Sequence, residues 1–205
     1  FEQASTSMTL FADRVVDREV FGFTVLASQF QSLNSLFIII FAPFFAWLWM
    51  RLDKFNMNPN IPLKFTLALF FVAAGFGVMI IGSGMANATG QVAAIWLVLM
   101  YFLHTSGELC LSPVGLSAVT KLSPKNIVGF SMGTWFLATG LSEILAAKIA
   151  NIAAVDTVAA ETMSVSEFLV KYNELFWFML KLGMGAALVM LILSYPLKKM
   201  MHGVK

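Results

Sequence analysis

Five long apolar stretches follow one another along the chain, and short polar segments separate them. They cover residues 30–50, 65–86, 92–120, 127–155 and 176–197. A helix of about 20 apolar residues crosses a hydrocarbon core about 30 Å thick. The pattern therefore predicts five membrane-spanning helices. We expect the polar segments between them to form loops and interfacial turns, as the two prolines within residues 56–62 indicate for one of them.

Residues 1–12 form a sixth apolar segment with a helical pattern, but it is too short to cross the same core. We interpret it as the end of a further span whose beginning lies outside this sequence. The segment opens with Glu2 and Gln3 and carries four hydroxyl side chains, a run too polar for a lipid-facing surface. We therefore expect an inward face, on which Glu2 carries a proton or pairs with a cation. An acid at the membrane interface is the alternative.

The composition agrees with a membrane protein. The chain is 59% hydrophobic and 12% charged, whereas soluble domains are about 45–50% apolar and about 25% charged. The net charge of +2 is too small to indicate a nucleic-acid partner. Cys110 is the one cysteine, so the chain contains no disulfide pair.

Basic residues are distributed unequally between the two sets of loops. One set carries Arg51, Lys54, Lys64, Lys121, Lys125, Lys198, Lys199 and Lys205; the other carries Arg14, Arg18 and Lys171. Loops rich in lysine and arginine remain on the cytoplasmic side. The pattern predicts that the C-terminus is cytoplasmic and that the chain crosses the bilayer several times.

Glu108 is the clearest candidate for chemistry, because it lies well inside the stretch 92–120. An ionised side chain in hydrocarbon is costly unless it has a partner or a water-filled cavity. Ser112 and Leu116 follow at spacings of four and eight, which places all three residues on roughly one helical face. Pro113 removes a backbone donor from this helix and can bend it. The combination suits proton coupling, and a buried structural acid is the alternative.

Two further stripes of polar or aromatic side chains have helical spacing. They comprise Gln31, Asn34 and Ser35 in one segment, and Ser131, Trp135, Thr139 and Ser142 in another. Each stripe can face inward, where it binds a substrate or joins neighbouring helices. The indole of Trp135 can pack against a ligand and donate one hydrogen bond.

No pattern in the sequence supports a metal, a cofactor or catalysis. His104 precedes Glu108 by four residues, a spacing that allows a proton relay or two metal ligands. No further ligand cluster accompanies the pair. His104 and Ser106 lie on one helix without the Gly-Xaa-Ser-Xaa-Gly turn of many serine hydrolases, so we expect no enzyme.

Several motifs resemble those of bacterial proton-dependent oligopeptide transporters. The most specific is residues 107–117, which read Gly-Glu-Leu-Cys-Leu-Ser-Pro-Val-Gly-Leu-Ser. Phe-Glu-Gln at 1–3, Gln-Ser-Leu-Asn at 31–34, Lys-Leu-Ser-Pro-Lys at 121–125 and Met-Gly-Thr-Trp-Phe-Leu at 132–137 follow the family's order and spacing. The resemblance extends over the whole chain, from partway through the family's seventh helix to the end of its twelfth.

The resemblance implies an all-α membrane fold of the major facilitator superfamily, built from two six-helix bundles around a central cavity. This chain would be the C-terminal bundle with its first helix truncated, and the N-terminal bundle of the same transporter would be its partner. The implied setting is the lipid bilayer of the bacterial inner membrane.

The resemblance also implies roles for particular residues. Glu108 resembles a glutamate that pairs with the opposite bundle and with the peptide's amino group, which Asn34 also contacts. Ser112 and Trp135 resemble residues of the peptide pocket. Leu116 resembles an inner-gate residue, and Glu2 resembles an acid linked to protonation and the outer gate.

The expected function is half of a symporter that uses the proton gradient to import di- and tripeptides by alternating access. Another small solute such as nitrate is an alternative on the same scaffold, because a fold does not fix a substrate. The acid Glu108 argues against an anionic substrate. A non-transporting membrane subunit is the alternative from a different class.

Overall fold

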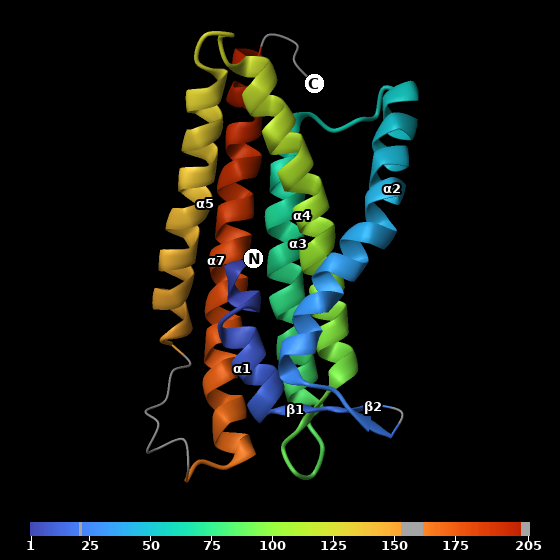
Figure 1. The fold of residues 1–205 in the computed structure, drawn as a ribbon, viewed down its shortest axis with the longest axis vertical. Coiled ribbons are helices and arrows are strands. Elements are labelled where there is room, and N and C mark those ends of the chain that lie inside the picture. The colour runs from blue at the N-terminus through green and yellow to red at the C-terminus, as the bar shows by residue number, and fades with distance from the viewer. Residues whose placement is uncertain (21, 153–161, 202–205) are drawn as a thin grey trace.

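The computed structural model describes residues 1–20, 22–152 and 162–201, most of them in long helices that run the length of the molecule (Figure 1). These helices are α2 (Ser32–Lys54), α3 (Ile61–Gly84), α4 (Ala94–Leu122), α5 (Val128–Ala150) and α7 (Val165–Met200). Short connections join α2, α3, α4 and α5, and these four helices alternate in direction. The end of the bundle that holds the α2–α3 and α4–α5 connections also holds the end of α7 (Figure 1).

In the part of the chain that the structure describes, four segments are long and apolar enough to cross a membrane: Ala27–Lys54, Ile61–Gly84, Ala94–Leu122 and Val165–Met200. Helix α5 is not among them, although the sequence pattern predicts a span there. Its serines and threonines, together with Glu143 and Lys148, lower its hydropathy. The last predicted span, 176–197, lies toward the C-terminal end of the much longer α7. Residues 153–155, the end of another predicted span, lie outside the described residues.

Helix α3 is the centre of the packing, with its most extensive contacts to α4 and α7. Small residues permit the close approach. A Cβ added to Gly183 of α7 would lie 3.0 Å from the Cβ of Ala73 in α3. Phe76 and Met79 of α3 are fully buried in the main hydrophobic core, which Phe176 of α7 also joins. Inside a bilayer the hydrophobic effect does not drive helices together, so close van der Waals contacts of this kind hold them together.

Helices α2 and α5 pack much more loosely. No residue of α2 is buried, and its upper half leans away from α3 and α4 (Figure 1). Pro43 lies inside this helix, where its ring removes one backbone hydrogen bond and allows a bend. In α5 only Ala146 is buried among the described residues. Both helices therefore present large apolar surfaces that lipid or further protein would have to cover.

The N-terminal segment is less regular than the predicted single helix. A short 3-10 helix, η1 (Glu2–Ala4), precedes α1 (Ser7–Arg14). Four two-residue strands, which the sequence pattern does not predict, form two small pairs: β1 (Val16–Asp17) with β4 (Val92–Ala93), and β2 (Glu19–Val20) with β3 (Phe23–Thr24). The β1–β4 pair connects the end of α1 to the start of α4.

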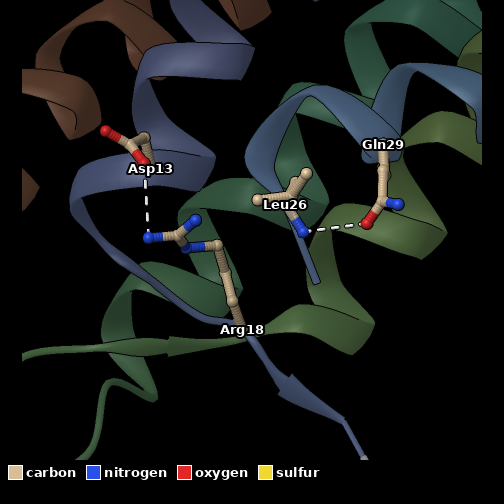
Figure 2. Close-up of polar contacts among 4 residues, drawn as sticks. All are labelled: Asp13, Arg18, Leu26 and Gln29. Atoms are coloured by element: carbon tan, nitrogen blue, oxygen red, sulfur yellow. Dashed lines mark hydrogen bonds and ion pairs between the residues drawn. The ribbon is translucent and has the colours of Figure 1, made fainter. Parts of the chain in front are cut away.

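Polar contacts stabilise the connection from α1 to α2 (Figure 2). Arg18 forms an ion pair with Asp13 at 3.3 Å. The backbone N–H of Leu26 donates a hydrogen bond to Oε1 of Gln29 at 2.9 Å, which caps the 3-10 helix η2 (Ala27–Gln31). Helix α2 continues directly from η2.

Candidate functional site

A polar cavity of about 220 Å³ lies where η1, η2, α2 and α4 meet. It brings together Glu2, Asn34 and Glu108, three of the residues that the sequence singles out. The remaining lining residues are Phe1, Ala4, Ser5, Gln31, Tyr101 and His104. Residues that are far apart in the sequence, in the ranges 1–5, 31–34 and 101–108, therefore line one small cavity.

A hydrogen bond between α2 and α4 joins two of the residues that line this cavity. Asn34 Nδ2 donates to Glu108 Oε2 at 2.8 Å and lies 3.2 Å from Thr105 Oγ1. Thr105 is buried, and its hydroxyl donates to the carbonyl of Tyr101 one turn earlier at 2.8 Å. In the described part of the chain, Oε1 of Glu108 has no hydrogen-bond partner. A carboxylate can accept at both oxygens, so Glu108 retains acceptor capacity toward the cavity.

Gln31 holds the N-terminal segment against α2. Its Nε2 donates to the hydroxyl of Thr9 at 2.6 Å and lies 3.5 Å from the carbonyl of Ala4. Gln31 and Asn34 thus share an inward face, as their spacing predicts. Ser35, the third member of that stripe, is exposed and does not line the cavity.

Glu2 also lines the cavity and is partly buried. In the described residues no hydrogen bond or ion pair reaches its carboxylate. Gln3, its neighbour, is 3% exposed and donates from Nε2 to the carbonyl of Ala146 in α5 at 2.9 Å. Gln3 also accepts a hydrogen bond from the hydroxyl of Ser7. The inward polar face of this segment therefore contacts α5 as well as the cavity.

His104 does not form a relay with Glu108. Its Nε2 lies 3.1 Å from the carbonyl of Val72 in α3, and its ring packs 4.9 Å from that of Phe76. Gly75 of α3 leaves room for this ring, because a Cβ there would lie 2.5 Å from Cδ2 of His104. His104 thus joins α3 to α4 in a tightly packed contact.

The other predicted site residues lie away from this cavity. Ser112 and Leu116 are partly buried, further along α4. Trp135 lines a larger apolar cavity of about 810 Å³ between α3, α4, α5 and α7. Its ring covers Gly115, where an added Cβ would lie 2.2 Å from Cη2 of the indole.

The α5 stripe is divided in the same way. Ser131 lines the apolar cavity with Trp135. The hydroxyls of Thr139 and Ser142 donate to carbonyls of their own helix, at 3.3 and 2.6 Å.

Two residues that the sequence pattern did not single out are Tyr101, which lines the cavity, and Thr105, which contacts Asn34 beside it. They precede Glu108 by seven and three residues, so helical periodicity could have found both. Where the chain is described, no group of three His, Cys, Asp or Glu residues could hold a metal ion.

Long apolar helices, loosely covered on two sides and enclosing an acidic polar cavity, define a multi-pass α-helical membrane protein. Residues 1–168 match the POT family. The chain therefore belongs to the POT family, and its fold is that of the major facilitator superfamily.

Three similar proteins illustrate the relationship. The chain is 43% identical to the peptide transporter YePEPT of Yersinia enterocolitica over 73% of its own length and 30% of that protein's. It is 37% identical to dipeptide and tripeptide permease A of Erwinia pyrifoliae over 96% of its length and 39% of the permease's. A crystal structure of peptide transporter POT in complex with sulfate superposes with a TM-score of 0.74 at 37% identity, covering 95% of this chain and 36% of that one. The chain thus spans well under half the length of these relatives.

Proposed function

We propose that this chain is the C-terminal half of a proton-coupled symporter that imports di- and tripeptides by alternating access. The membership in the POT family and the names of the similar proteins support this proposal. On this proposal the protein is not an enzyme and lies in the bacterial inner membrane with its C-terminus in the cytoplasm. An N-terminal six-helix bundle of the same transporter would form the facing wall of the cavity.

The observation that carries the proposal is the hydrogen bond from Asn34 to Glu108 beside an open cavity. A peptide's ammonium group needs acceptors, and a carboxylate held by an amide offers one free oxygen in a site of low dielectric. We assign the amino-end pocket to Asn34 and Glu108. Ser112 and Trp135, which lie outside this cavity, would contact the peptide at other points of the path that the complete transporter forms.

Protonation would control the gates through the same carboxylates. Glu108 would alternate between the peptide and a cation of the opposite bundle, so that proton and substrate both bias one two-state equilibrium. Glu2 would act at the outer gate and Leu116 at the inner gate. The acceptor capacity that Glu2 and Glu108 retain toward the cavity supports these assignments.

Uptake by reconstituted vesicles tests the proposal. The complete protein should accumulate a labelled dipeptide when an inward proton gradient is imposed, and a proton ionophore should abolish the accumulation. This chain alone should accumulate nothing above empty vesicles, because one wall of the cavity is absent. Gradient-driven uptake by the chain alone would refute its role as half a transporter, and gradient-independent uptake by the complete protein would refute the symport.

A further inference from the structure

A separate cavity of about 470 Å³ lies between α2, α3 and α4, toward the end of the bundle where α2 ends and α3 begins. Its polar side chains are Trp49, Lys64, Ser117 and Lys121, and no carboxylate lines it. It shares no lining residue with the Glu108 cavity. The cavity is therefore a distinct site whose charge is entirely positive.

Lys64 is the unusual residue of this site, because it is a cation of which only 6% is exposed. Its Nζ lies 4.6 Å from the centre of the Trp49 ring. In the described residues its ammonium has no hydrogen bond or ion pair. Asp53, at the adjoining end of α2, forms no ion pair with Lys64. Its carboxylate instead lies 3.5 Å from the side-chain amide of Asn58. A buried cation normally has an anionic partner, and the aromatic ring supplies part of that stabilisation only.

The indole of Trp49 has a second unmet requirement. Its Nε1–H is buried and has no hydrogen-bond partner among the described residues. Lys121, from the last turn of α4, adds a second ammonium group to the same lining. The site thus presents two ammonium groups and an indole N–H, which are all donors. A ligand that satisfies them must be an anion with several acceptor oxygens.

The walls of the cavity identify the kind of anion. Phe45, Leu109 and Val114 make most of its lining apolar. The site lies at the lysine- and arginine-rich end of the bundle, where α2 ends and α3 begins. α2, which forms one wall, has no buried residue and is open to its surroundings. A phosphate that carries hydrocarbon chains fits both the donors and the walls.

We propose that this cavity binds an anionic phospholipid of the leaflet at the basic end of the bundle. The phosphate would lie between Lys64 and Lys121 and accept a hydrogen bond from Trp49, and an acyl chain would follow the apolar wall between α2 and α4. The bound lipid would fill the space where α2 leans away from the bundle. This inference does not depend on the transported solute.

Native mass spectrometry of the complete protein in detergent tests the proposal. Phosphatidylglycerol would be titrated against phosphatidylcholine with the same acyl chains. We expect preferential retention of phosphatidylglycerol, and Lys64→Met and Lys121→Met should each weaken it by about fivefold or more, the effect of losing one basic residue at a membrane surface. Lys125→Met is the matched control, since Lys125 is exposed and outside the cavity lining, and should bind as the parent does.

Two further arms distinguish a bound lipid from a free anion. Trp49→Phe keeps an aromatic ring beside Lys64 but removes the unpartnered indole N–H. It should therefore weaken phosphatidylglycerol binding while Lys64 stays in place. Excess inorganic phosphate should not displace the lipid, because phosphate lacks the acyl chain. Displacement by phosphate would assign the site to a free anion and overturn the proposal. Equal lipid binding by the parent and Lys121→Met would also overturn it, even if Lys64→Met failed to fold.

Discussion

Glu108 is the residue whose surroundings are most specific. It is partly buried on a long apolar helix, it accepts one hydrogen bond from another helix, and it faces a small cavity. A carboxylate in such a position attracts a cation more strongly than one in water, because its surroundings screen charge poorly. A single substitution can remove the charge of Glu108 while keeping the size of its side chain.

Glu108→Gln should weaken dipeptide binding by the complete protein and impair gradient-driven uptake more than the loss of affinity explains. Glutamine keeps the size and can still accept from Asn34, but it cannot pair with an ammonium or titrate. Losing a charge-assisted hydrogen bond costs about 1.5–3 kcal/mol, roughly tenfold to a hundredfold in affinity. Calorimetry and vesicle uptake measure the two effects. Glu143→Gln, on the exposed surface of α5, is the control, and parental binding and uptake in Glu108→Gln would leave Glu108 a structural role.

Trp135 presents the opposite case, since its position agrees with packing as well as with binding. Its ring covers Gly115 and lines the large apolar cavity. In the complete protein with its other tryptophans replaced, a saturating dipeptide should change the emission of Trp135 if the peptide contacts the indole. The same experiment without a peptide, but with an equal concentration of a free amino acid, is the control. Unchanged emission would assign Trp135 to packing alone.

At the scale of elements, α3 and α4 make a tight contact that a pair of substitutions can test. Gly75 faces His104, whereas Gly77, on the same helix, would meet only Leu180 at 3.8 Å. His104 also contacts the α3 carbonyl of Val72, so its ring cannot move away without losing that interaction. The two glycines therefore form a natural pair for substitution.

Gly75→Ala should lower the unfolding temperature of the detergent-solubilised protein, whereas Gly77→Ala should not. Overpacking a close contact costs about 1–3 kcal/mol, which exceeds the gain of about 1 kcal/mol from replacing glycine inside a helix. At position 77 the same gain applies without the clash. Thermal unfolding followed by circular dichroism measures both. A Gly75→Ala protein at least as stable as Gly77→Ala would mean that His104 has a second place for its ring.

At the scale of the whole molecule, charge is distributed between the two ends of the bundle. Arg51, Lys54, Lys64, Lys121 and Lys125 lie at the end that contains the α2–α3 and α4–α5 connections, and Lys198 and Lys199 lie in the last turn of α7 at the same end. The opposite end has fewer basic residues. From this asymmetry we predict that the basic end lies in the cytoplasm.

Cysteine labelling in intact cells checks that orientation. Ala88→Cys, in the α3–α4 connection, should react with a membrane-impermeant maleimide, whereas Met57→Cys, in the α2–α3 connection, should react only after permeabilisation. Both positions are exposed, and the native Cys110 is fully buried, so the parent serves as the unlabelled control. The reverse pattern would place the C-terminus outside the cytoplasm.

The sequence by itself determined the class of this protein and the approximate position of most helices. Apolar length is a local property, because a helix satisfies its own backbone hydrogen bonds and needs only enough apolar residues to cross the bilayer. The apolar pattern places residues 65–86 and 92–120 within two to four residues of α3 and α4. Glu108 was also recognisable locally, since an acid inside an apolar helix requires a partner or a cavity.

Only the tertiary structure decided which side chains meet. Asn34 and Glu108 are 74 residues apart and bond because α2 crosses α4 at that height. His104 lies one turn from Glu108 on the same helix, yet it bonds to α3, because Gly75 opens a space on that side. Trp135 packs over Gly115 of α4, and it lies outside the cavity that Asn34 lines. Helical spacing assigns a residue to a face, but the packing of neighbouring helices determines what that face contacts.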